Sequence, residues 1–250
     1  MNEHFSSAHL TLERAHFHIS DLEGQINEFR HNNSWAYFVE TDPETGDQIH
    51  KIRFTHKVLV RWSCVLFDAV NNLRAVLDQT AYAVAVITES PSTKHVAFPF
   101  AKDKAHWAAK VAGCCKDLPP EIVSLFEASN AYKGGNDTLW AMNELCNTKK
   151  HFKLVPMSMQ GLAITTSPPL GDSTSERPFW DAENLQLIFL RVPAGQNVNH
   201  NVHVAYNISV EGIDVLAAKT VSGFIHNAHK IVEGILVTTE AECRRLGFIS

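Results

Sequence analysis

Two stretches of the chain place hydrogen-bonding side chains at helical spacing. The first polar stripe consists of Asn71, Arg74, Asp78 and Tyr82. The second consists of Trp140, Glu144, Asn147 and His151. Residues three or four apart share one face of a helix, so each stripe adjoins an apolar face. A histidine, an arginine and an aspartate brought together there can transfer a proton, stabilise an anion and orient one another.

We expect the two stripes to meet if their helices pack through their leucine and methionine faces. Arg74 and Asp78 would then contact Asn147 and His151 in a partly buried polar cluster that binds an unidentified small molecule or protein. The other ligand-binding candidates are Asn71, Tyr82, Lys150 and Glu144. In the structural alternative, Arg74 and Asp78 form an ion pair within one helix, and the residues around His151 satisfy a helix C-terminus.

The competing hypothesis makes the same cluster the site of an enzyme. His151 is then the acid or base, Arg74 stabilises an anion, and Asp78 orients one of them. The substrate would be RNA or a small molecule. The chain has no glycine-rich phosphate loop, G-x-S-x-G elbow or H-E-x-x-H motif, and we expect no cofactor.

Both stripes also carry a family resemblance. The segments from Asn72 to Gln79 and from Trp140 to His151 are similar to two signature stretches of a large group of uncharacterised bacterial proteins. In that group the stretches read N-L-R-x-x-L-D-H and N-x-D-K-H, so Gln79 and Lys149 depart from the pattern. The Phe98-Pro99-Phe100 segment also fits, and the likeness covers roughly the first 155 residues. The resemblance implies a shared fold and no activity.

The R-x-x-x-x-H spacing of that group overlaps the motif of HEPN-type ribonucleases, in which the two residues cleave RNA without metal. Here Gln79 occupies the histidine position and cannot transfer a proton, so this chemistry would need His151 from the other helix. The chain has 22 Lys and Arg against 27 Asp and Glu, a formal net charge of -5. RNA binding is therefore allowed but not favoured by charge.

A third hypothesis is a histidine and carboxylate metal site. Glu13 and His16 form an E-x-x-H pair, and His9 extends the same helix face. The last helix offers His226, His229 and Glu233, which complete a site only if the two helices lie side by side. We nevertheless predict no stoichiometric metal, because one such pair is expected by chance in a chain with 14 histidines.

Apolar periodicity predicts the elements that position these residues. Helices are expected over about 6–29, 58–88, 102–112, 121–128, a segment ending near 150, and 213–242. Strands are expected over 35–39, 49–54, 153–159 with 163–166, 185–192 and 202–210, with a loop over 167–178. This order lacks βαβ alternation and predicts an α+β fold, with one antiparallel sheet backed by long helices. We expect a single domain over 1–250, with a helical signature part to about 155.

Composition limits the class of protein. The chain has 250 residues, of which 45% are hydrophobic and 20% charged, values typical of globular proteins. Its five cysteines form no Cys-x-x-Cys pair, which suits a reducing compartment. The start resembles no signal peptide, and apolar runs such as Ala81–Ile87 are too short for a bilayer. We therefore expect a cytoplasmic protein with no membrane partner.

Overall fold

The structure, a computed structural model, describes residues 2–32, 35–54, 58–149, 157–167, 179–181, 184, 186–196 and 201–250. The chain divides into two compact units. Unit 1 comprises Met1–Glu23, Trp62–Met157 and Ser209–Ser250, and unit 2 comprises Gly24–Arg61 and Ser158–Ile208. The single domain expected from the sequence stays a prediction.

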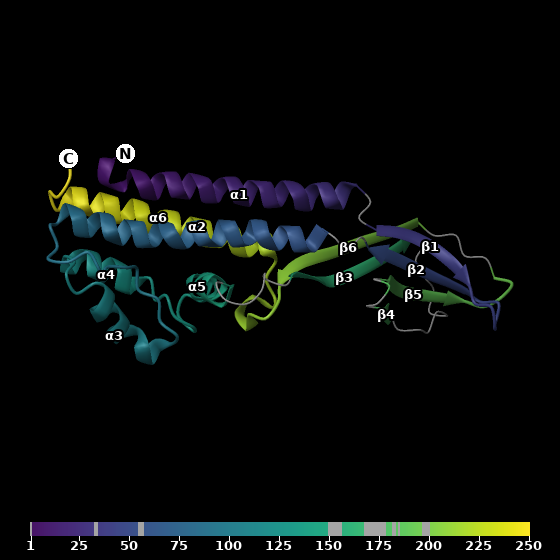
Figure 1. The fold of residues 1–250 in the computed structure, drawn as a ribbon. Coiled ribbons are helices and arrows are strands. Elements are labelled where there is room, and N and C mark those ends of the chain that lie inside the picture. The colour runs from purple at the N-terminus through teal and green to yellow at the C-terminus, as the bar shows by residue number, and fades with distance from the viewer. Residues whose placement is uncertain are drawn as a thin grey trace. The chain divides into compact units, whose positions relative to one another are not determined.

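Helices dominate unit 1 (Figure 1). In the described residues they are α1 (Ser6–His31), α2 (Val58–Ile87), α3 (Lys104–Cys114), α4 (Pro120–Ala128), α5 (Asp137–Lys149) and α6 (Val221–Arg245). The first part of α1 and most of α2 belong to this unit. Short 3-10 turns, η1 (Glu3–Phe5) and η2 (Asp214–Leu216), precede α1 and α6. No helix in these ranges is long and apolar enough to cross a membrane.

The prediction for the last helix is wrong at its start. We expected the helix to begin at Ile213, but α6 begins at Val221 after the η2 turn. The hydroxyl of Thr220 accepts a hydrogen bond from the Gly223 N–H at 3.0 Å and so caps the helix. A threonine at this position satisfies one of the backbone donors that have no partner within the helix, which fixes where α6 starts.

The apolar face of α2 forms the centre of the core, as its spacing predicts. Its fully buried positions are Trp62, Leu66, Val70, Leu73, Leu77, Ala81 and Val84. They step by three and four residues, so α2 turns one continuous stripe inward. The polar stripe that begins at Asn71 therefore lies at the edge of this core.

The helix expected over about 6–29 is present as α1, but two of the apolar residues whose spacing indicates it do not pack inward. Leu10 and Phe17 are 61% and 59% exposed. The buried side chains of α1 are Ala8, Leu12, Ala15, Ile19, Leu22, Ile26 and Phe29. Small alanines complete this stripe at the correct helical angle, so α1 approaches the core through them rather than through the larger Leu10 and Phe17.

Leu10→Gln is therefore expected to change the free energy of unfolding by less than about 0.5 kcal/mol, as for other exposed positions. Urea unfolding of the variant and the parent protein measures this difference. A loss above about 1 kcal/mol would show that Leu10 is covered in solution.

Unit 2 contains the antiparallel sheet and confirms the α+β class. The hairpin β1 (Trp35–Thr41) and β2 (Gln48–Phe54) pairs with Trp35 opposite Phe54 and Thr41 opposite Gln48. Strand β2 continues the sheet onto β5 (Gln186–Val192), and β5 pairs with β4 (Phe179–Asp181). Strand β4 was not predicted. Most of the expected loop over 167–178 lies outside the described residues.

The later strands do not all join this sheet. Strands β3 (Met157–Ser167) and β6 (Asn201–Val210) form a two-stranded sheet of their own, so the single sheet that we expected is wrong in this respect. The turn of the β1–β2 hairpin is tied to β5, because Arg191 Nη1 lies 2.7 Å from Asp42 Oδ2 and 3.4 Å from Asp47 Oδ2. These contacts connect the hairpin turn to the end of β5, beside the β2–β5 pairing.

Candidate functional site

The first polar stripe joins α2 to two other segments of unit 1. Arg74 Nη1 donates a hydrogen bond of 2.7 Å to Asn143 Oδ1 on α5. The guanidinium carbon lies 4.5 Å from the centre of the Phe100 ring, within the range of a cation–π contact. Asp78 Oδ1 accepts the Phe98 N–H at 3.1 Å. We call this group the Arg74 clamp, because Arg74 and Asp78 hold α5 and the 98–100 segment against α2. Its members are Arg74, Asp78, Phe98, Phe100 and Asn143.

The ion pair within the clamp is loose. Asp78 Oδ2 lies 3.4 Å from Arg74 Nε, at an alignment that leaves this buried N–H without a hydrogen bond. The side chains of Arg74 and Asp78 are 22% and 38% exposed. Water therefore screens the pair, and the hydrogen bond to Asn143 and the Phe100 contact carry most of the clamp.

The predicted cluster is brought together only in part. Arg74 contacts Asn143, one turn before the predicted partner Asn147, which is exposed. His151 and Lys150 lie outside the described residues, so their place in the cluster stays a prediction. Asn71 donates to the Phe67 carbonyl within its own helix at 2.8 Å.

Two further candidates lie at the edge of this region. Tyr82 is an exposed side chain at the end of the first stripe, and Glu144 is half-buried. Sequence reasoning missed Asn143, although a signal was present. Asn143 is a buried amide beside Met142 on the apolar face of α5, where only a hydrogen-bonded polar side chain is expected.

The histidines considered for a metal site lie between α1 and α6, which do run side by side. His9 Nε2 lies 2.7 Å from Glu240 Oε2, and His226 Nε2 lies 2.8 Å from Glu23 Oε1. The rings of His16 and His229 are 5.5 Å apart. These groups meet in pairs along the helices, and no set of three metal-ligating side chains converges among the described residues.

The metal prediction is checked by elemental analysis of protein purified without a histidine tag. We expect less than one equivalent of zinc, iron or manganese. One equivalent of metal that is lost in the variants His16→Ala and His229→Ala would contradict this prediction. The contact between α1 and α6, which we call the α1–α6 seam, would then be a metal site.

Glu240 makes the stability of the α1–α6 seam dependent on pH. Burial tends to raise the pKa of the Glu240 carboxyl, but hydrogen bonds from His9, the Asn2 backbone and Arg244 outweigh it, so the pKa is lowered. A carboxyl whose pKa is lower in the folded state stabilises the fold above its unfolded pKa. That stabilisation is lost as the pH falls through the folded pKa.

Glu240→Gln is therefore expected to lower stability by about 1 kcal/mol at pH 7, because an amide accepts weaker hydrogen bonds than a carboxylate. Below the unfolded pKa of about 4.3 the variant should lose less stability than the parent as the pH falls further. Urea unfolding at a series of pH values measures both effects. The exposed Glu13→Gln is the control, and equal acid slopes for Glu240→Gln and the parent would refute the assignment.

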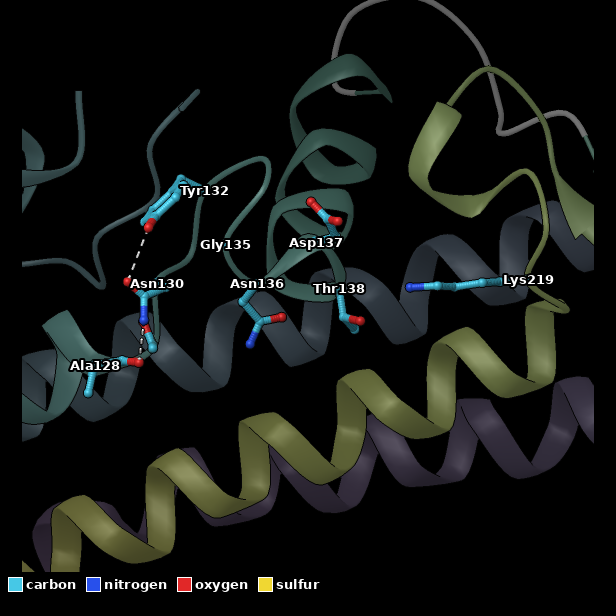
Figure 2. A pocket seen from close by; sticks show the side chains of 9 residues that line it. Ala128, Asn130, Tyr132, Gly135, Asn136, Asp137, Thr138 and Lys219 are labelled. Carbon is cyan, nitrogen blue, oxygen red and sulfur yellow. Dashed lines mark hydrogen bonds between the residues drawn. The ribbon is translucent and has the colours of Figure 1, made fainter. Parts of the chain in front are cut away.

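An open surface pocket of about 590 Å³, which we call the cavity, lies in unit 1 at the beginning of α5. Its wall is formed by the end of α4, the loop that follows it, the first turn of α5 and one residue before α6 (Figure 2). The lining residues are Ala128, Ser129, Asn130, Tyr132, Gly135, Asn136, Asp137, Thr138 and Lys219. Most of them present a hydrogen-bonding group, so the cavity is polar.

The loop that forms this wall is held by its own backbone. Asn130 has a φ of 49°, in the left-handed region that asparagine tolerates. Its carbonyl accepts the N–H groups of Tyr132 and Asn136, both at 2.7 Å. A Cβ at Gly135 would lie 2.6 Å from the same carbonyl oxygen and 2.8 Å from the Tyr132 ring. Only glycine therefore fits there, and the wall has a defined shape before any ligand arrives.

Lys219 provides the positive charge of the cavity. Figure 2 shows its side chain extending along the cavity toward Thr138 in the first turn of α5. No hydrogen bond or ion pair joins its ammonium group to another residue in the part of the chain that the structure describes. Lys219 was not considered from the sequence, because nothing in the spacing links position 219 to the start of α5.

Two cysteines have a shifted pKa, and neither is an activated nucleophile. Burial, followed by the neighbouring Cys114, raises the pKa of Cys115 to about 12. Burial, followed by the charges of Glu242 and Glu240, raises the pKa of Cys243 to about 11. At neutral pH both groups are protonated, whereas a nucleophilic cysteine requires the thiolate.

No known protein family, curated protein or solved structure matches this chain. The chemistry of the cavity and of the Arg74 clamp therefore rests on their geometry alone.

Proposed function

We propose that the protein binds a small polar molecule in the cavity at the beginning of α5. The observation that carries this proposal is the cavity itself, an open and polar pocket of about 590 Å³ with a loop and a helix start in its wall. Its lining includes Lys219, a charged side chain with no partner among the described residues. An acceptor group on a ligand can pair with this ammonium group.

The shape of the cavity supports the same proposal. The hydrogen bonds to the Asn130 carbonyl fix the wall, and a preformed site binds without the cost of ordering a loop. The wall is also tied to the Arg74 clamp. The Ala101 N–H donates to the Ala131 carbonyl at 3.1 Å, next to Asn130, and Phe100 lies against Arg74. The predicted polar cluster then serves the site by positioning its wall.

The RNA-cleaving hypothesis gains no comparable support. Its proton-transfer residue, His151, lies outside the described residues, and the formal net charge of -5 opposes a phosphate backbone. A ligand-binding role needs neither a proton donor nor a basic surface, so it is the function that we put forward.

The proposal is tested by screening small polar metabolites against the isotope-labelled protein. The set includes sugars, amino acids, carboxylic acids, phosphate esters and nucleotides. We expect at least one compound to shift the backbone amide signals of residues 129–138 and 219 in a saturable way. Absence of binding across the set, or saturable shifts that map elsewhere, would overturn the proposal.

A blocking variant makes the screen specific. Ala128 lines the cavity and is exposed at the end of α4, so Ala128→Tyr should fill the cavity without disturbing the core. The matched control is Ala109→Tyr on α3, an exposed alanine that does not line the cavity. Binding should be lost in the first variant and kept in the second.

A further inference from the structure

Three side chains of the cavity have hydrogen-bond donors with no partner within the described part of the chain. Asn136 Oδ1 accepts the Leu139 N–H at 3.1 Å, which fixes the amide and leaves its two N–H donors open. Thr138 is buried, at 5% exposure, and its hydroxyl oxygen accepts from Asn227 at 2.9 Å, so the hydroxyl proton is left to donate. The ammonium group of Lys219 adds three donors and a positive charge.

The acceptors of the cavity are largely used within the protein. The Asn130 carbonyl accepts two N–H groups, and Asn130 Oδ1 accepts the Tyr132 hydroxyl at 3.3 Å. Asp137 Oδ1 accepts the Gly134 N–H at 2.8 Å. The second oxygen of Asp137 remains as an acceptor, together with the hydroxyl oxygens of Ser129 and Tyr132, whose protons are donated within the protein. The donor hydrogens of Lys219, Asn136 and Thr138 still outnumber these three acceptor atoms, which favours a ligand with acceptor oxygens.

We infer that the ligand of this cavity carries one oxyanion, a carboxylate or a phosphate, held by Lys219, Asn136 and Thr138. This inference rests on the proposed function. A charged acceptor satisfies the ammonium group and the two neutral donors together, and hydrogen bonds to charged groups are the strong ones. Asp137 disfavours a second negative group nearby and favours a hydroxyl group on the rest of the molecule.

The test compares three probes that share a three-carbon skeleton: glycerate, glycerol 3-phosphate and glycerol. The first carries a carboxylate, the second a phosphate and the third no charge, so the pair of anions distinguishes the two sources of the oxyanion. Binding is followed by titration of the amide signals of Asn136, Thr138 and Lys219 in the full-length protein. We expect one or both anions to bind, glycerol to bind at least tenfold more weakly, and affinity to fall with added salt.

Variants connect the result to the residues. Lys219→Gln should weaken anion binding about tenfold or more, because it removes a charge-assisted hydrogen bond. Lys219 is exposed, so the variant should fold normally. The matched control is Lys230→Gln, an exposed lysine on α6 that does not line the cavity, and it should bind like the parent.

The outcomes separate the two proposals. Equal binding of glycerol and the anions, or binding of the anions that Lys219→Gln leaves unchanged, would overturn the oxyanion and leave a polar-ligand site. The oxyanion would also be overturned if a neutral compound from the wider screen bound to the cavity and no anion did. If nothing in that screen reaches the cavity, the proposed function itself fails.

Discussion

Arg74→Ala is expected to lower the free energy of unfolding by about 2 to 4 kcal/mol. The variant loses the hydrogen bond to Asn143, the contact with Phe100 and the positive charge beside Asp78. A hydrogen bond to a charged group contributes about 1.5 to 3 kcal/mol, and a cation–π contact about 0.5 to 2 kcal/mol. The effect stays below that of a fully buried ion pair, because water still reaches Asp78.

Urea unfolding measures this loss, and two variants interpret it. Arg14 lies 5.4 Å from the ring of Phe17 on the exposed side of α1, so Arg14→Ala removes a similar contact from a hydrated site and should cost less than about 1 kcal/mol. Arg74→Lys keeps the charge but not the planar fork, and should recover only part of the stability. A loss of less than about 1 kcal/mol in Arg74→Ala would refute the clamp.

A local measurement distinguishes the clamp from a general packing defect. In Arg74→Ala, amide hydrogen exchange at Ala101 should accelerate more than exchange in the middle of α6, because the 98–101 segment loses its anchor on α2. A double-mutant cycle with Asn143→Ala isolates the contact between α2 and α5, since these two residues touch directly.

The buried face of a helix was predicted well where the sequence contains a single apolar stripe. The apolar stripe of α2 recurs at helical spacing without glycine or proline, and its positions from Trp62 to Val84 are buried. In α1 two apolar sets compete, and the alanines that complete the true face give a weaker signal than Leu10 and Phe17. The prediction used the spacing of the larger apolar residues and left out Ala8 and Ala15, which complete the buried face.

The site was harder to predict because its contacts join distant parts of the chain. The i, i+4 relation of Arg74 and Asp78 is local, and the structure contains it. The Asn143 contact depends on how far α5 slides along α2, which a single sequence does not determine. The cavity depends on the left-handed Asn130 and on Lys219 arriving from the other end of the chain. Neither has a periodic signature.

Gly135→Ala is expected to lower the free energy of unfolding by about 1 to 3 kcal/mol and to abolish ligand binding in the cavity. The added Cβ would lie 2.6 Å from the Asn130 carbonyl oxygen and 2.8 Å from two carbons of the Tyr132 ring. Because the clashing oxygen belongs to the backbone and accepts two hydrogen bonds, the loop cannot move it without losing the Tyr132 and Asn136 contacts. Stability and the shape of the wall are then lost together.

A glycine-to-alanine substitution in α6 is expected to change the free energy of unfolding in the opposite direction. Gly234 lies within α6, where an added Cβ meets nothing within 4 Å, so Gly234→Ala should raise stability by about 0.5 to 1 kcal/mol and leave binding intact. Thermal unfolding and ligand titration of both variants make the comparison. Equally tight ligand binding by Gly135→Ala and the parent would contradict this prediction. The loop would then not be a rigid wall, and the ligand would have to bind to a surface other than the one formed by Asn130 and Tyr132.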